Sequence, residues 1–166
     1  MRWLARRRVP LGFLSAAIAM LFADPTPRSM VVGGVIALAG EALRIWAAGH
    51  LEKGREVTVS GPYRLTRHPL YIGSALIGIG VAVASANAVV AVLVAVYLSV
   101  TLTAAIRTEE AHLTAKFGGA YPEYRDGRAA HVRRRFSLSR AVRNREYRAV
   151  AGLGLALVLL WWKVIA

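Results

Sequence analysis

Residues Gly61 to Gly73 read GPYRLTRHPLYIG, a polar segment with a turn-forming Gly-Pro pair that leads directly into a long apolar run. From Leu70 to Ile106 the chain has 37 residues without a charged side chain. One transmembrane helix needs only about 20 residues, so this run predicts two spans. Ser85-Ala86-Asn87 is the expected turn between them, which gives an antiparallel helical hairpin of residues 70–85 and 88–106.

The composition also indicates a membrane protein. Hydrophobic residues make up 56% of the 166-residue chain, charged residues make up 19%, and the mean hydropathy is +0.45. Three further apolar segments, about 9–23, 29–50 and 149–166, complete an all-α integral membrane fold of about five transmembrane helices in a single domain, residues 1–166. The chain has no cysteine, which excludes disulfides and thiolate ligands, and we expect no metal site.

The first apolar segment has two interpretations. Four arginines precede residues 9–23, as in the basic region of a secretory signal peptide. Leu21, however, occupies a position where cleavage after Ala23 would require a small residue. We therefore favour a retained first helix.

The second apolar segment carries a small-residue face and two charges. Gly33, Ala37 and Gly40 are spaced four and three residues apart, so another helix can approach closely there. Glu41 and Arg44 lie one turn apart at a depth where charge is costly and usually marks a site. The slightly favoured alternative is an internal ion pair, with the Arg44 side chain reaching towards the nearby end of the span.

The distribution of basic residues predicts the orientation. With the N-terminus in the cytoplasm, the cytoplasmic segments are residues 1–8, 51–69 and 107–148, and they hold 19 of the 22 lysines and arginines. This asymmetry follows the positive-inside rule. We expect the plasma (inner) membrane, with both polar segments and one shared active site on the cytoplasmic side.

A net charge of +13 raises the question of nucleic acid binding, but the positive-inside rule accounts for most of it. Arginines interleaved with apolar residues between Val132 and Arg148 indicate a segment that lies on an anionic membrane surface. No nucleic-acid-binding module is recognisable around them. The expected partner is therefore the membrane and not nucleic acid.

The two polar segments at the ends of the hairpin carry the candidate chemistry. His68 precedes Pro69 at a helix N-terminus, where free N–H groups and the helix dipole favour an anion such as a carboxylate. Glu109 and Glu110 follow the returning span and can accept hydrogen bonds from hydroxyls or pair with an ammonium group. Together they suit a zwitterionic ligand with a ribose. The alternative, a capping histidine and a solvated acidic helix end, stays open from these residues alone.

Gly61-Pro62-Tyr63, Arg67-His68-Pro69-Leu70-Tyr71-Ile72-Gly73 and the later pattern Glu109-Glu110-x-x-Leu113-x-x-x-Phe117-Gly118-x-x-Tyr121-x-x-Tyr124 together resemble the isoprenylcysteine carboxyl methyltransferase family and its phospholipid methyltransferase relatives. The resemblance covers roughly residues 40 to 128. It implies an integral-membrane, S-adenosylmethionine-dependent methyltransferase with the cofactor at the cytoplasmic face. The methyl acceptor, a lipid or isoprenoid, would enter from the bilayer.

Carried over to this chain, the resemblance implies roles for the matched residues. The cofactor-binding residues would be Tyr63, Arg67, His68, Pro69, Tyr71, Gly73, Glu109 and Glu110. The catalytic residues would be Arg107, which matches a basic position that could orient an acceptor carboxylate, and Glu110. Arg44, Tyr121, Tyr124 and Arg125 are the candidates for contact with the acceptor.

The reaction itself has several alternatives. Carboxyl O-methylation is the first expectation, and it needs an arginine such as Arg107 or Arg44 to steer a carboxylate. N-methylation of a phosphatidylethanolamine-type amine needs a base to take a proton, such as Glu109, Glu110 or His112. After Tyr124 the chain departs from the family pattern and leads to a basic stretch and another apolar run, which leaves the acceptor open. An NADPH-dependent sterol-type reductase and a non-enzymatic membrane scaffold are the remaining alternatives.

Overall fold

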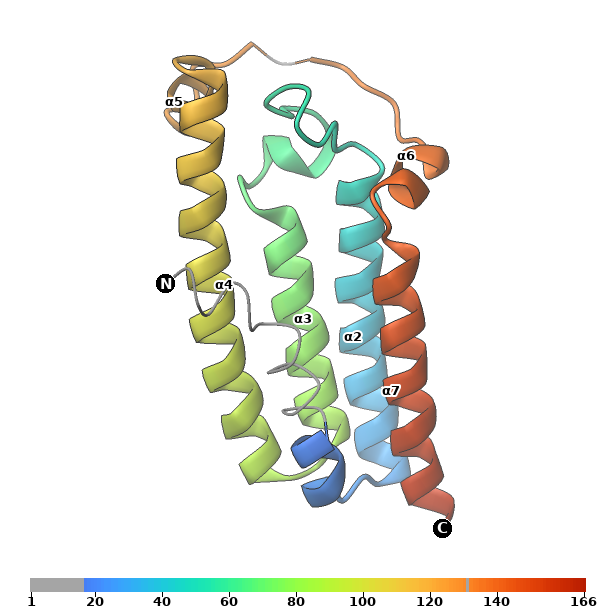
Figure 1. Ribbon diagram of the computed structural model, residues 1–166. Coiled ribbons are helices and arrows are strands. Elements are labelled where there is room, and N and C mark those ends of the chain that lie inside the picture. Colours follow the sequence, from blue (N-terminus) through green and yellow to red (C-terminus); the bar gives the residue numbers. More distant parts are fainter. Residues whose placement is uncertain (1–16, 131) are drawn as a thin grey trace.

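The computed structural model describes residues 17–130 and 132–166, and every regular element within these ranges is a helix. The long helices are α2 (Pro27–Ala48), α3 (Pro69–Ala84), α4 (Ala88–Phe117) and α7 (Tyr147–Ile165). The short ones are the 3-10 helix η1 (Gly61–Arg64), α5 (Ala120–Arg125) and α6 (Leu138–Arg143), which gather at one end of the bundle (Figure 1). The predicted all-α fold is confirmed.

Three of the helices, α2, α4 and α7, are long and apolar enough to cross a membrane, and α3 is apolar but has 16 residues. These four helices begin and end within two residues of the predicted spans, apart from the C-terminal end of α4. The predicted first span, 9–23, lies largely outside the described residues, and its described residues 17–22 are helical.

Helix α4 continues well beyond the predicted boundary at residue 106 and ends at Phe117. Residues 107–117 are rich in glutamate, alanine, leucine and lysine, which favour helix, and they contain neither glycine nor proline. The helix ends where Gly118 adopts a positive φ of 53°. The sequence suggested that Glu109 and Glu110 follow the helix. In the structure they lie on its last turns.

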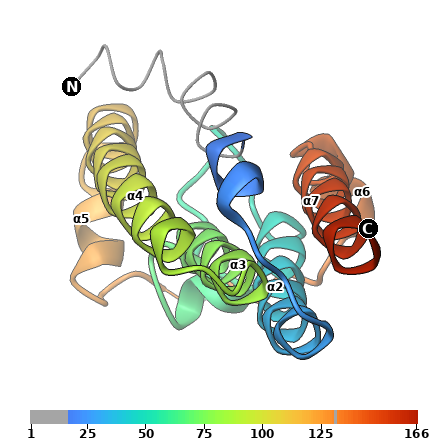
Figure 2. The same cartoon turned by 90° about the horizontal axis from the view of Figure 1, so that it is seen from below.

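Helices α2 and α3 pack closely through small residues, as predicted from Gly33, Ala37 and Gly40. A Cβ atom on Gly33 would overlap the backbone of α3, and one on Gly80 would overlap the backbone of α2. Figure 2 views the bundle along its axis and shows α3 between α4 and α2, with α7 beside α2. This tight pair is the frame to which α4 and α7 are attached.

One end of the bundle, called the polar end below, collects most of the charged residues. Helices α2 and α4 end there, α3 and α7 begin there, and the connecting segments 49–68 and 118–146 cover it (Figure 1). The two polar segments singled out in the sequence therefore lie at the same end of the molecule.

Candidate active site

The carboxylate of Glu110 connects the two polar segments. Its Oε1 accepts a hydrogen bond from His68 Nε2 at 3.0 Å and another from the Tyr121 hydroxyl at 3.2 Å. Arg67 Nη1 lies 3.7 Å from the same oxygen. Two residues just before α3 and one residue of α5 thus contact the same carboxylate of α4. These contacts hold the last turns of α4 against the start of α3.

Three tyrosines tighten this junction. The Tyr124 hydroxyl donates to the carbonyl oxygen of Tyr63 at 2.6 Å, and Tyr63 itself is buried. Burial, together with the negative charge of Glu110, raises the pKa of Tyr121 to about 12. Burial also raises the pKa of Tyr124 to about 12. Both hydroxyls therefore stay protonated and act as donors at neutral pH.

A cavity of about 660 Å³ opens beside this junction at the polar end. Its wall includes seven residues predicted for the site: Arg44, Tyr63, Arg67, Tyr71, Glu109, Tyr121 and Tyr124. On α4 the lining extends from Phe117 back to Val100, which corresponds to about 25 Å of helix at about 1.5 Å per residue. The cavity therefore reaches from the polar end into the apolar part of the bundle.

The other predicted residues lie outside the cavity lining. His68 and Glu110 pair with each other behind its wall, and Pro69 and Gly73 are buried at the start of α3, where Gly73 faces α2. Arg107 is exposed on α4. Arg125 is exposed on α5, where its Nε lies 3.2 Å from Asp126 Oδ1. The structure thus places seven of the predicted site residues in the cavity wall. His68, Glu110, Pro69 and Gly73 lie outside the wall, where they hold the helices together.

Glu109 and Glu110 have different surroundings although they are adjacent. Glu109 lines the cavity, and so does His112 one turn later. Among the contacts between described residues, the side chains of Glu109 and His112 have no hydrogen-bond or ion-pair partner. Glu109 thus offers a carboxylate to the cavity, whereas the carboxylate of Glu110 is already engaged.

Asn144 and Glu146 are among the wall residues that were not predicted from the sequence, and both come from the chain after the predicted motifs. Glu146 Oε1 lies 2.7 Å from Nε of Arg44, and the Asn144 amide donates to the carbonyl oxygens of Ala48 and Leu51, both at 2.9 Å. The signal that could have indicated Glu146 is its position as the single acidic residue between Gly127 and the C-terminus.

The expected pair of Glu41 and Arg44 is present, but Arg44 has a closer partner and also lines the cavity. Glu41 Oε2 lies 3.9 Å from Arg44 Nε, but Glu146 is the closer partner, and a further hydrogen bond joins Arg44 to Ser74. Glu41 is buried, and both its carboxylate oxygens are without a hydrogen-bond partner among the described residues. Arg44 is therefore held mainly by the start of α7 and still lines the cavity.

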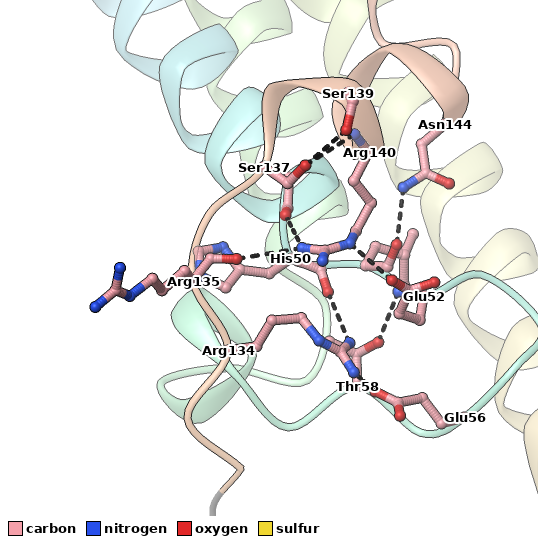
Figure 3. A network of polar contacts seen from close by, with 12 residues as sticks. His50, Glu52, Glu56, Thr58, Arg134, Arg135, Ser137, Ser139, Arg140 and Asn144 are labelled. Carbon is pink, nitrogen blue, oxygen red and sulfur yellow. Dashed lines mark hydrogen bonds and ion pairs between the residues drawn. The ribbon is translucent and has the colours of Figure 1, made fainter.

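Residues 49–60, called the roof loop below, contribute to the cavity lining. Polar contacts join this loop to residues 132–148, called the C-terminal segment below (Figure 3). Arg134 Nη2 lies 2.7 Å from Glu56 Oε1, and Arg140 Nε lies 2.8 Å from Glu52 Oε1. Arg140 also donates to the carbonyl oxygen of Gly49. The roof of the cavity is thus attached to a part of the chain about 80–90 residues away in sequence.

The helical bundle and its largely apolar cavity, which opens at the polar end, define a membrane protein with a candidate site for a small molecule. Residues 30–120 match the family model described as phospholipid methyltransferase, which is more than half of the chain. The chain therefore belongs to the phospholipid methyltransferase family, and this family points to a membrane methyltransferase. No curated protein and no solved structure gives a significant match. The matched region contains the first polar segment together with Glu109 and Glu110, and it ends before Tyr121, Tyr124 and Glu146.

Proposed function

We propose that this protein is an S-adenosylmethionine-dependent methyltransferase that acts on a lipid or isoprenoid acceptor embedded in the membrane. The observation that carries the proposal is the junction at Glu110, which joins both motif segments into one wall of a cavity at the polar end. The family match of residues 30–120 supports the same reaction class.

The residues of the cavity fit such a cofactor. The volume of the cavity, about 660 Å³, lies within the range of about 300–1,000 Å³ that is usual for small-molecule sites. The carboxylate of Glu109 suits ribose hydroxyls or an ammonium group, and the guanidinium of Arg67 suits a carboxylate. Tyr71 and Phe117 provide aromatic surface in the same wall. In this proposal His68 and Glu110 hold the wall in place and do not contact the cofactor directly.

When bound, the cofactor would supply an electrophilic methyl group on a sulfonium, and an acceptor atom would bond to the methyl carbon in line as the thioether leaves. Such a displacement depends on alignment and on exclusion of water more than on acid–base chemistry. The roof loop contributes Val57 and Thr58 to the lining and limits access of water from the polar end. The apolar side chains of Val100, Ala104 and Ala105 extend the lining along α4 and suit the hydrocarbon part of an acceptor.

The geometry favours an amine acceptor over the carboxylate that we expected first. Arg107 lies outside the cavity lining, and Arg44 already pairs with Glu146 at 2.7 Å. His112, in contrast, lines the cavity without a partner among the described residues and is not assigned to the cofactor, so it can accept the proton that an ammonium group must lose before methylation. Carboxyl O-methylation remains the second candidate because the guanidinium of Arg44 faces the same space.

Binding and transfer can be tested on the purified full chain in nanodiscs. We expect saturable binding of S-adenosylmethionine that NADPH does not displace, and a strong loss of binding in Glu109→Gln. Labelled methyl groups should pass to phosphatidylethanolamine in preference to a prenylcysteine. Binding of NADPH instead would assign the protein to the reductases, and binding of neither ligand by a folded sample would leave the scaffold alternative.

A further inference from the structure

The C-terminal segment of residues 132–148 has an inner and an outer side with different charge environments. On the inner side, Arg134 and Arg140 form ion pairs with Glu56 and Glu52 of the roof loop. Asn144 binds two backbone carbonyls of the same region. The inner side is therefore fully committed to contacts within the protein.

The outer side carries five arginines that are exposed: Arg133, Arg135, Arg143, Arg145 and Arg148. Within the described part of the chain none of them forms an ion pair. Arg148 makes a cation–π contact with the ring of Tyr147. Figure 3 shows the Arg135 side chain pointing away from the polar network. Four of these charges have no counter-charge among the described residues, and Arg143 acts only through a longer-range attraction to Glu52, whose pKa it helps to lower. Most of this charge is therefore left for a partner outside the protein.

Apolar side chains are exposed on the same segment. Leu138 and Val142 are 65% and 54% exposed, and their spacing of four residues places them on one face of α6. Val132 is 51% exposed. Arginines next to exposed aliphatic side chains are typical of segments that lie at a membrane surface, where the apolar groups enter the bilayer and the guanidinium groups remain among the headgroups.

The position of the segment fits this environment. Helix α6 lies directly before α7, and Arg145, with a φ of 63°, makes the turn between them (Figure 1). Helix α7 is one of the three helices that can span a membrane, and its exposed apolar surface begins at Val150. The segment therefore meets the membrane at the level where hydrocarbon gives way to headgroups.

We propose that the outer side of residues 132–148 is a docking surface for anionic phospholipid headgroups in the leaflet at the polar end. Four positive charges without a counter-charge among the described residues, with Arg143 beside them, favour an anionic surface over a zwitterionic one, and the interaction weakens as salt screens it. The exposed Leu138 and Val142 provide the apolar contact that distinguishes a lipid surface from a soluble polyanion. This inference concerns a surface apart from the cavity and does not depend on the methyltransferase proposal.

The absence of cysteine in the chain allows a direct test. An environment-sensitive fluorophore attached to Leu138→Cys reports the polarity around α6 in the full-length protein, reconstituted in vesicles of phosphatidylcholine with or without phosphatidylglycerol. We expect a blue shift and quenching by lipid-borne quenchers that both increase with phosphatidylglycerol and decrease with salt. The control label on Glu123→Cys, exposed on α5 at the same end, should respond to neither.

Charge variants complete the test. Replacing Arg133, Arg135 and Arg143 by Gln should abolish the effect of phosphatidylglycerol on the Leu138→Cys label. Replacing Arg55, Arg64 and Lys116, which are equally exposed at the polar end, removes the same charge and should leave the effect intact. A water-exposed label in both kinds of vesicle, an equal shift in both, or an equal loss in the two triple variants would each overturn the proposal. Circular dichroism verifies that each variant retains its helical content.

Discussion

Glu146 at the start of α7 places its Oε1 atom 2.7 Å from Nε of Arg44 in α2, across 102 residues of sequence. Both side chains line the cavity, and that of Glu146 is only 7% exposed. A buried charge is costly unless it is paired, so each of these residues depends on the other. The contact joins the region matched by the family model to a C-terminal helix beyond it.

Glu146→Gln should destabilise the protein by about 1–3 kcal/mol, because the partly buried guanidinium of Arg44 loses its closest counter-charge while the side-chain shape is retained. Thermal unfolding in detergent, followed by circular dichroism, measures this change. Glu123→Gln removes an exposed carboxylate that has no ion-pair partner in the described part of the chain, and it should leave the midpoint unchanged. An unchanged midpoint in Glu146→Gln as well would contradict the importance of the pair.

The neighbouring residues Glu109 and Glu110 should respond differently to the same substitution. Glu109→Gln should weaken binding of S-adenosylmethionine by about tenfold or more, equivalent to about 1.4 kcal/mol, without lowering the melting temperature. Glu110→Gln should lower the melting temperature and binding together, because Glu110 accepts hydrogen bonds from His68 and Tyr121. Isothermal titration and thermal unfolding of both variants separate the two roles. Equal melting temperatures for the two variants would argue against a supporting role for Glu110.

The sequence predicted the bundle well because its strongest signals are local. An uncharged run of 37 residues with one central turn can hardly form anything but a hairpin in a membrane, and the small residues of α2 indicate close helix packing. The boundary of α4 was missed because hydropathy marks where a helix leaves the apolar region, not where its backbone stops. Helix propensity over residues 107–117 was the better guide at that point.

The details of the site depend on relations that the sequence does not contain. Consecutive residues on a helix point about 100° apart, and the face of α4 that lines the cavity includes Thr108 and Glu109 but not Glu110. Which of the two glutamates lines the cavity is decided by where α3 lies, since His68 engages Glu110. Similarly, Arg44 and Glu41 appeared to be a pair because they are one turn apart, but α7 brings Glu146 closer. Contacts of this range follow from packing and not from spacing.

Stability should fall at alkaline pH as the buried tyrosines of the junction titrate. Burial raises the pKa of Tyr121 and Tyr124 from an ordinary 10 to about 12 in the folded protein. Between these values the folded state binds more protons than the unfolded state, so the free energy of unfolding decreases as pH rises from about 10 to about 12. Chemical unfolding at several pH values measures the slope. Tyr121→Phe combined with Tyr124→Phe should reduce it, and an unaltered slope would assign the effect to Tyr63, whose pKa burial also raises.

The attachment of the roof loop can be tested by separating an inner arginine from an outer one of the same segment. Arg140 binds Glu52 at 2.8 Å and the Gly49 carbonyl, whereas Arg135 points away from the network (Figure 3). Arg140→Gln should therefore accelerate amide hydrogen exchange in residues 50–58 on the order of tenfold, because the loop opens more often without the contacts of Arg140. Arg135→Gln, measured in the same detergent, should leave exchange in the loop unchanged. If both variants exchange at the wild-type rate, backbone contacts alone hold the loop; if both exchange faster, the total charge of the segment matters more than the ion pair.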